Sequence, residues 1–346
     1  MKSQETTKIN RQKSHTIQLL NRSLLAILLS AACVTPLMAH DVKTVTLPAD
    51  SIDGLAAAIA EAGPGGKVII ADGLHQESGT VLINNPVSII GEPNAVIETA
   101  TTAMEPNSSP PFAITPALHI QGTHDVAVER IWFRSPPESS SSTAIVIEDS
   151  PRVAIRNNRI TGLDFGIFVE RGDHAEIEGN RIEKIDKHGI VVINGQHARI
   201  LGNIITETGA FGIWACDYNG ECKFNSMSQT FIGLILCRVG EDSFEMAGEK
   251  MDGAYDSANG WLVAHNEAND NFLGFAVDER AYNNYLIGNA ASGNELYDVD
   301  FVFNTHDNIL VQGPFSGPLL IHVCGDNNQV KGSNVTFSED SCDPPN

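Results

Sequence analysis

The residues best suited to chemistry lie in two matching stretches of the C-terminal third of the chain. LGFAVDERAYNN (273–284) places Asp278, Glu279 and Arg280 after a short apolar run, and YDVDFVFNTHDN (297–308) places Asp300 in a related position. Paired carboxylates can act as acid and base, or as nucleophile and acid, in glycoside hydrolysis. An arginine base beside a carboxylate-held Ca²⁺ would instead suit uronate lyase or epimerase chemistry, because the cation acidifies the carbon next to the substrate carboxylate. Exposed Asp, Glu and Arg on a turn also form ordinary surface ion pairs.

Two other residues are candidates for substrate binding. Trp214 can stack on a sugar ring, and Arg238 can contact an acidic group. Arg238, Arg280 and Lys250 are also the bases available for a lyase reaction.

These side chains belong to a repeat. Strand openings of the type Gly-Ile, Gly-Leu or Gly-Phe begin at Gly166, Gly189, Gly212, Gly233 and Gly274, with spacings of 23, 23, 21 and 41. Asparagines in matching contexts stand at Asn158, Asn180, Asn203, Asn225, Asn266 and Asn289, with spacings of 22, 23, 22, 41 and 23. A period of 21 to 24 residues with three short strands per unit predicts a right-handed parallel β-helix, and the asparagines are then expected to stack in a structural ladder.

The alternation of residues within each strand predicts which side chains point outward. In GIFVE, Ile167 and Val169 point inward, and Phe168 and Glu170 point outward. The equivalent outward pairs are Val191/Ile193, Trp214/Cys216, Ile235/Cys237, Ala276/Asp278 and Asp300/Val302. Because adjacent coils lie roughly 4.8 Å apart, we expect Asp278, Glu279, Arg280 and Asp300 to cluster, with Arg238 and Trp214 further along the same face.

The ends of the repeat region and its one insertion are also visible in the sequence. SIDGLAAAIAEA (51–62) predicts an amphipathic helix that begins at an N-cap Ser51, ends at the glycines after residue 62 and caps the solenoid. The insertion, about 239–259, explains the spacing of 41 and could form a wall beside the outward face.

Residues 51–337 resemble the right-handed β-helix superfamily of pectate-lyase-like and sugar-hydrolase proteins. ADGLHQESGTVLINNPVSIIGE (71–92) is similar to the first coil of many members, and the coils at 144–312 are similar to those of periplasmic nitrous-oxide-reductase accessory proteins and of alginate epimerases. The resemblance implies an all-β, single-stranded solenoid of about ten coils that recognises a polysaccharide on the sheet that begins each coil. VDFVF (299–303) is similar to a pectin methylesterase motif in which Asp300 would be the nucleophile, but Asn304 replaces its glycine. The pectate lyase, polygalacturonase and alginate epimerase motifs are absent.

The composition of the chain limits the classes of partner that it is expected to bind. The chain has 346 residues, 43 acidic against 22 basic side chains and a formal charge of −21, while 42% of it is hydrophobic. The hydrophobic fraction excludes global disorder, and the charge argues against a nucleic-acid partner.

The N-terminus predicts export. Residues 1–39 combine a basic leader, a short apolar run and a small residue at Ala39, which is typical of a signal peptide cleaved near that residue. A lipoprotein signal with Cys33 as the lipidated residue is the alternative. We expect residues 40–346 to form one periplasmic or secreted domain without a transmembrane segment.

The cysteines fit an oxidising compartment. The chain after residue 39 holds Cys216, Cys222, Cys237, Cys324 and Cys342. Cys216 could pair with Cys237 across the sheet or with Cys222 around a turn, and Cys324 is expected to pair with Cys342. A copper or zinc site of Cys216, Cys222 and Cys237 is the alternative, although no histidine lies at ligand spacing.

The sequence therefore predicts an exported β-helix that recognises a polysaccharide and could act on it as a lyase, epimerase or glycoside hydrolase. No cofactor is predicted with certainty; Ca²⁺ is compatible with the lyase and epimerase alternatives. A non-enzymatic accessory protein or binding scaffold, for metal delivery or adhesion, is the second class.

Overall fold

The computed structural model describes residues 42–99, 115–136, 143–237, 257–278, 280–312, 318–340 and 342. The predicted signal peptide and Cys33 lie outside the described residues. So does most of the predicted insertion, of which residues 257–259 are described. All described residues belong to one compact unit, Val42–Asn346.

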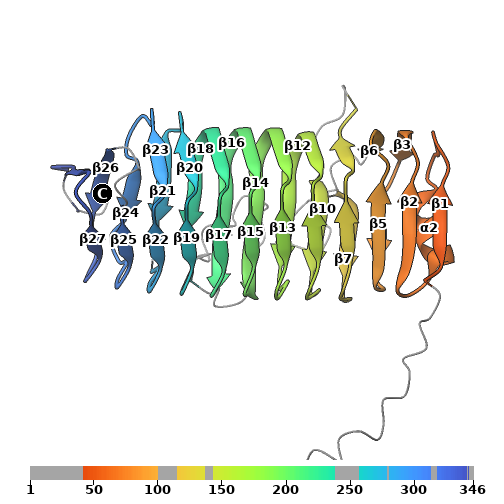
Figure 1. Ribbon diagram of the computed structural model, residues 1–346, viewed down its shortest axis with the longest axis horizontal. Coiled ribbons are helices and arrows are strands. Elements are labelled where there is room, and N and C mark those ends of the chain that lie inside the picture. The colour runs from red at the N-terminus through yellow and green to blue at the C-terminus, as the bar shows by residue number, and fades with distance from the viewer. Residues whose placement is uncertain are drawn as a thin grey trace, which may run out of the picture. The chain divides into compact units, whose positions relative to one another are not determined.

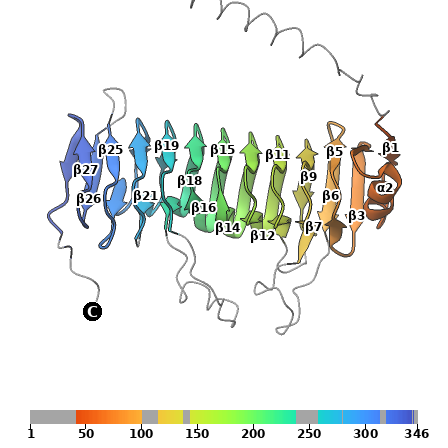
Figure 2. The ribbon, with the colours of Figure 1, turned by 90° about the horizontal axis from the view of Figure 1, so that it is seen from below.

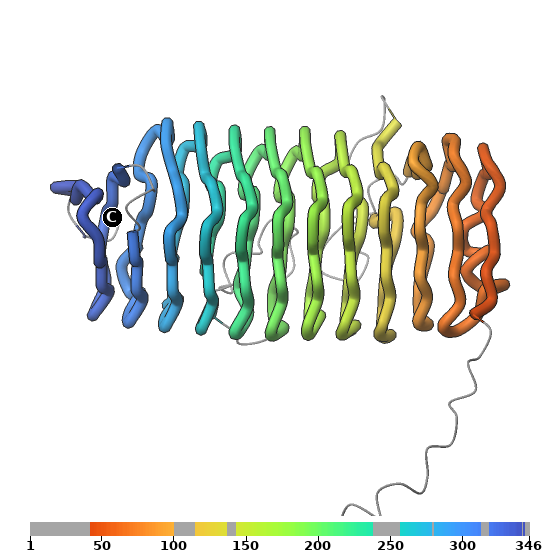
Figure 3. The backbone as a smooth tube through the Cα atoms, viewed as in Figure 1, coloured from red at the N-terminus to blue at the C-terminus, as the bar shows by residue number. Residues whose placement is uncertain are grey.

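The unit is a right-handed parallel β-solenoid of about eleven turns with one helix. Its strands lie side by side from the end that carries α2 to the end that carries β27, as Figures 1 and 3 show. Every strand pair in the described residues is parallel, and each strand pairs with its equivalents one turn before and one turn after. The fold class predicted from the repeat is confirmed.

One face of the solenoid is a twelve-stranded sheet. In spatial order its strands are β1 (Thr44–Leu47), β2 (Gly66–Ile70), β5 (Val87–Gly91), β8 (Ala127–Glu129), β11 (Ala154–Arg156), β13 (Glu176–Glu178), β15 (Arg199–Leu201), β17 (Glu221–Lys223), β19 (Leu262–Ala264), β22 (Tyr285–Ile287), β25 (Ile309–Val311) and β27 (Gln329–Lys331).

The other two faces are joined into a sixteen-stranded sheet. They merge because the long central strands pass from one face to the next without a break; these are β12 (Arg159–Glu170), β14 (Arg181–Gln196), β16 (Ile204–Tyr218) and β18 (Ser226–Leu236). The short strands of the second face are β3 (Gly73–Glu77), β6 (Ala95–Thr99), β9 (Trp132–Arg134), β20 (Glu267–Asn269) and β23 (Ala290–Ser292). Those of the third face are β4 (Val81–Ile83), β7 (Pro116–Gln121), β10 (Thr143–Glu148), β21 (Leu273–Val277), β24 (Val299–Phe301), β26 (Leu319–Val323) and β28 (Val335–Phe337).

The core is a set of apolar columns inside the coils. One column on the third face runs through the predicted inward positions Ile167, Ile190, Ile213, Leu234, Phe275, Val299 and Ile321, which are register partners on successive strands. All of them are buried. Stacking of large aliphatic side chains along the axis removes apolar surface from water at every turn, and this burial favours the coiled conformation.

The asparagine ladder is structural, as predicted. Asn180 donates from Nδ2 to Asn203 Oδ1 at 3.0 Å, and Asn203 donates in the same way to Asn225 at 2.9 Å. Each amide also donates to a backbone carbonyl of the preceding coil. These bonds satisfy polar groups that are buried at the turn, so the asparagines are not free to bind a ligand.

The helix α2 (Leu55–Ala62) covers the first end of the solenoid, which Figure 2 shows in the rotated view. It begins four residues later than predicted. Its N-cap residue is Gly54, which has no side chain that could bond the first backbone N–H groups. The prediction that Ser51 is the N-cap is wrong, because its hydroxyl lies 2.8 Å from His75 Nδ1. Glu77 Oε1 instead accepts the Leu55 backbone N–H at 3.1 Å.

No helix within the described ranges is long and apolar enough to cross a membrane.

Candidate functional site

The outward side of the third face has an apolar middle. We call this group the outer cluster; its members are Phe165, Phe168, Val191, Ile193, Trp214, Cys216, Ile232, Ile235, Cys237, Leu273, Ala276 and Tyr297. They form a hydrophobic cluster separate from the core, and none is more than 8% exposed. These side chains point out of the coils, as predicted. They pack against one another, however, and do not form an open polar groove.

Trp214 is therefore not available as a stacking platform for a sugar. It is 5% exposed, and its ring centroid lies 5.0 Å from that of His188 and 5.5 Å from that of Phe211. The prediction of a substrate-binding Trp214 is wrong for this conformation, because side chains from neighbouring coils cover the indole.

The disulfide pattern settles the cysteine alternatives. Cys216 and Cys237 are bonded across adjacent coils with a Cα–Cα distance of 5.2 Å, and Cys324 is bonded to Cys342. Cys222 is a buried free thiol, and burial raises its pKa. The Cys216–Cys222 bridge is thus wrong. A three-cysteine metal site is wrong as well, because two of its sulfurs are bonded to each other.

Asp300 finds a partner that the sequence analysis did not name. Asp300 on β24 and His322 on β26 are register partners, and His322 Nδ1 lies 2.8 Å from Asp300 Oδ1. Both side chains are mostly buried, with 15% and 14% exposed. Burial raises the pKa of the Asp300 carboxyl, and the hydrogen bond from His322 opposes that shift.

Tyr297 completes this group. Its ring stacks on the His322 imidazole with 5.0 Å between centroids, and its hydroxyl donates to the carboxylate of Asp340. This hydrogen bond is the main cause that raises the pKa of the Tyr297 phenol. We call Asp300, His322, Tyr297 and Asp340 the dyad site, after its central Asp–His pair.

The C-terminal disulfide lies against the dyad site. Cys324 Sγ is 3.3 Å from His322 Nε2. An ionised Asp300 can only accept, so Nδ1 of His322 carries the hydrogen and Nε2 is the basic nitrogen. A disulfide sulfur has no hydrogen to donate, so the lone pair of Nε2 is not used by Cys324. The ligand atoms of His322, Cys324 and Cys342 lie within 4.8 Å of one another, but the two sulfurs are consumed by their bond.

Arg280 lies in a pocket beside this disulfide. The pocket has a volume of about 710 Å³ and is also lined by Asn304, His306, Asp326 and Cys342. Seven of the nine described arginines form ion pairs, whereas Arg280 and Arg130 form none with a described residue. Arg280 does not pair with Asp300. The two residues, predicted to cluster, lie in different places: Asp300 in the dyad site and Arg280 in the pocket beside it.

The remaining predicted residues divide into two groups. Asp278 is half-buried at the end of β21, where its backbone N–H donates to the Leu236 carbonyl at 2.7 Å. Glu279, Arg238 and Lys250 lie outside the described residues.

A second histidine–carboxylate pair occupies the other end of the outward side. His119 Nε2 lies 3.1 Å from Glu148 Oε2, with side-chain exposures of 16% and 17% that match the dyad site. Glu148 also accepts from Gln121 at 2.9 Å and pairs with Arg171 at 3.4 Å. Glu148 thus shares its negative charge among three donors, whereas the Asp300 carboxylate bonds His322. Glu148 is therefore less able than Asp300 to orient its histidine as a base.

The sequence held a signal for His322 that the repeat analysis did not use. GPLLIHVCGDNN (317–328) is one more coil, and its histidine stands where the preceding coil has Asp300. The distance from Asn308 to Asn328 is only 20 residues, shorter than the period of the central coils. Tyr297 and Asp340 meet because β28 pairs with β26 on the third face and Asp340 follows β28 by three residues.

Comparison with known proteins supports the fold. Residues 84–235 match the family model "Right handed beta helix region". The A-module of the mannuronan C-5 epimerase AlgE6 of Azotobacter vinelandii aligns with a TM-score of 0.58 at 13% identity, covering 87% of this chain and 98% of that one. The alginate lyase from Paenibacillus sp. str. FPU-7 aligns with a TM-score of 0.54 at 11% identity, covering 85% and 99%. PfbA, a surface adhesin of Streptococcus pneumoniae, aligns with a TM-score of 0.50 at 12% identity, covering 83% and 86%.

The described residues thus have the right-handed parallel β-helix fold, and the match to the family model covers residues 84–235. A comparison with curated proteins finds no significant sequence match. At these identities the structural likeness concerns the fold alone, and the similar folds include both enzymes and an adhesin. Function must therefore be argued from the site.

Proposed function

We propose that this protein is an exported polysaccharide-acting enzyme that removes a proton from the carbon next to the carboxylate of a uronate unit, as a lyase or epimerase. The observation that carries the proposal is the 2.8 Å hydrogen bond between His322 Nδ1 and Asp300 Oδ1, with Tyr297 stacked on the imidazole. A histidine oriented by a carboxylate is a suitable general base near neutral pH.

The reaction assigns a separate role to each group. His322 Nε2 accepts the C5 proton, and Asp300 is the positioning residue that holds the ring and stabilises its cationic form. In elimination, the C5–H electrons form the C4–C5 double bond as the C4–O bond breaks, and water gives a proton to the leaving oxygen. In epimerisation, C5 instead receives a proton from water on its other face.

The substrate carboxylate must be neutralised for C5 to become acidic. Arg280 has no ion-pair partner in the described part of the chain and lies in the pocket beside Cys342, so it is the side chain available for this task. Ca²⁺ could supply further neutralisation, although no three carboxylates of the described residues lie close enough together to form a preformed site.

Export is supported by two observations. The leader at 1–39 has the composition of a signal peptide, and two disulfides join described cysteines. Disulfides persist in oxidising compartments such as the periplasm and the cell exterior.

The test is product formation by the purified protein on uronate and neutral polysaccharides, with and without Ca²⁺. Unsaturated ends report elimination, reducing ends report chain cleavage, and proton NMR reports the C5 configuration. We expect His322→Gln to lower kcat roughly 100-fold or more, with Asp300→Asn also impaired. His119→Gln is the matched control, because it removes a histidine of similar burial and pairing from the same side and should change kcat less than about twofold. Full activity in His322→Gln would overturn the proposal.

A binding scaffold is the second candidate, and the outer cluster is the observation that favours it. The middle of the outward side is apolar and buried, so it presents no exposed acid or base that could act on a polymer. Retention on a polysaccharide without any product would support this adhesin-like role.

A further inference from the structure

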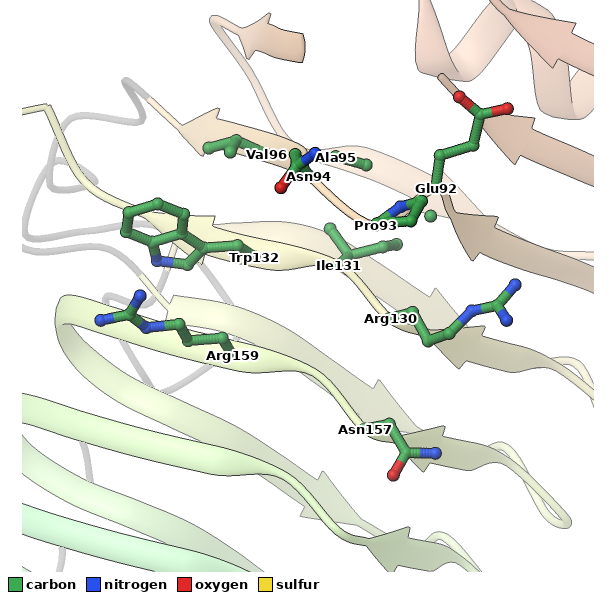
Figure 4. Close-up of a pocket in the computed structure, with 11 residues that line it drawn as sticks. Glu92, Pro93, Asn94, Ala95, Val96, Arg130, Ile131, Trp132, Asn157 and Arg159 are labelled. Atoms are coloured by element: carbon green, nitrogen blue, oxygen red, sulfur yellow. The ribbon is translucent and has the colours of Figure 1, made fainter. Parts of the chain in front are cut away.

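A second pocket lies far from the dyad site, near the first coils of the solenoid. It has a volume of about 680 Å³ and is formed where the turn between β5 and β6 faces the turn between β8 and β9. Figure 4 shows Trp132 and Arg130 toward opposite sides of it, with Pro93 and Ile131 between them. We call it the Trp132 pocket. It lies about six coils, or roughly 30 Å, along the axis from Asp300.

The indole of Trp132 is held in one orientation. Its Nε1–H donates to Thr161 Oγ1 at 2.9 Å, and the Arg159 guanidinium carbon lies 4.5 Å from the ring centroid. Arg159 is itself fixed by Glu183, which accepts from Arg159 Nε at 3.0 Å. The guanidinium carbon of Arg134, on the same strand, also lies 5.3 Å from the ring centroid. In the strand register Trp132 lies between Arg159 and Val96, and Val96 also lines the pocket.

Arg130 supplies an uncommitted positive charge. Its side chain is exposed and makes no hydrogen bond or ion pair in the described part of the chain, although the protein carries a net charge of −21. Its backbone adopts φ 59°, which turns the residue out of the strand path. A free guanidinium at the edge of a pocket is suited to a carboxylate or sulfate, because its planar fork binds two oxygens at once.

The walls of the pocket are rigid. Asp72 accepts from the Asn94 backbone N–H at 2.9 Å, and Glu92 Oε2 accepts the Asp72 backbone N–H at 3.0 Å. A side chain at Gly91 would bring its Cβ within 2.3 Å of the Arg130 carbonyl oxygen, so only glycine allows the two turns to approach this closely. A preformed pocket loses little conformational entropy when it binds a ligand.

We infer that the Trp132 pocket binds a segment of an acidic polysaccharide, with one sugar ring against the indole and the carboxylate or sulfate of another unit at Arg130. Ligand pockets typically combine such a volume with apolar walls and a few placed polar groups, and a sugar ring presents an apolar C–H face that an indole can cover. The choice of an acidic polysaccharide as the source of that unit rests on the proposed function. The pocket would hold the polymer at a distance from the reacting unit and raise its effective concentration there.

Tryptophan fluorescence can test the inference. The chain has three tryptophans, of which Trp261 and Trp214 are 0% and 5% exposed and Trp132 is half-exposed. Acrylamide quenching therefore reports mainly on Trp132. We expect purified oligouronates to reduce quenching in a saturable way and neutral oligosaccharides of equal length to do so at concentrations at least about tenfold higher.

Two arginine variants make the test specific. Arg130→Gln should weaken oligouronate binding about tenfold or more. Arg152→Gln is the matched control, because Arg152 is also exposed, has φ 57° and lies outside the pocket; it should change the affinity less than about twofold. Equal affinities of wild type and Arg130→Gln, or equal binding of acidic and neutral sugars, would overturn the inference.

The outcome is separable from that of the proposed function. Quenching protection that survives in His322→Gln, which is expected to lose product formation, assigns binding to the Trp132 pocket independently of catalysis. Product formation by wild type without any protection of Trp132 would refute this inference and leave the dyad site standing. Protection without any product would refute the enzymatic proposal and leave this inference standing.

Discussion

Three histidines on the third face differ in chemistry because their neighbours differ. His119 faces a carboxylate that Arg171 and Gln121 already hold. His322 faces Asp300, and among the described residues the side chain that bonds this carboxylate is the imidazole itself. His188 is 2% exposed and lies among aromatic rings, with centroids 4.8 Å away at Phe211 and 5.0 Å away at Trp214.

His188 should make the stability of the fold depend on pH. Burial, with a smaller contribution from Lys187, lowers its pKa from 6.5 to about 4. The unfolded chain therefore binds more protons than the folded protein between these values, and stability that is complete above about pH 6.5 is lost as the pH falls toward 4. Phe does not titrate, so in His188→Phe the decrease in the free energy of unfolding at low pH should be smaller by up to about 3 kcal/mol.

Urea unfolding of both proteins at pH 7.5 and pH 5 measures the effect. His197→Phe is the control, because it replaces an exposed histidine that directly follows the same strand, β14. An unchanged pH dependence in His188→Phe would contradict the assignment.

At the scale of elements, each turn is stabilised by its neighbours rather than by local propensity alone. Asn203 shows the pattern: its Nδ2 donates to Ile177 O and Asn225 Oδ1 at 2.9 Å, and its Oδ1 accepts from the backbone and side chain of Asn180. These groups are buried, so water cannot replace a missing partner.

Asn203→Ala should lower the free energy of unfolding by about 3 kcal/mol or more, because it leaves several buried polar groups without partners. Asn269→Ala is the matched control, since it removes a half-exposed asparagine whose side chain accepts one bond, from Ser292 at 2.8 Å. Denaturant unfolding compares the two variants. A loss no larger than that of Asn269→Ala would refute the structural role of the ladder.

At the scale of the whole solenoid, each coil contacts chiefly the coils beside it. A defect at one end should therefore weaken the near coils and leave the distant ones unchanged. The cap helix α2 offers the means to test this, because Leu55 is fully buried and packs in the core cluster.

We expect Leu55→Asp to accelerate amide hydrogen exchange roughly tenfold or more in residues 66–99, with no change in residues 262–311. Mass spectrometry of exchanged peptides resolves the two regions. Ala57→Asp places the same charge on the exposed side of the helix and should leave both regions unchanged. Uniform acceleration along the chain would show that the solenoid opens as one cooperative unit.

The repeat itself was readable from the sequence because it is a local pattern. Regular glycines and asparagines report a turn that must recur every coil, and alternating aliphatic residues report which side chains enter the core. The coil period, the asparagine ladder and the inward column followed from such patterns.

What surrounds an outward side chain was decided by the tertiary structure. Alternation gives the direction of Trp214 but not its burial, which depends on Phe211 of its own strand and on His188 of the coil before it. The spacing of 22 residues places His322 one coil after Asp300, but only the register of the two strands shows that their side chains meet. Sequence periodicity determined the solenoid because the same backbone pattern repeats in each coil, whereas the dyad site arises from stacking different coils, and only their register brings its side chains together.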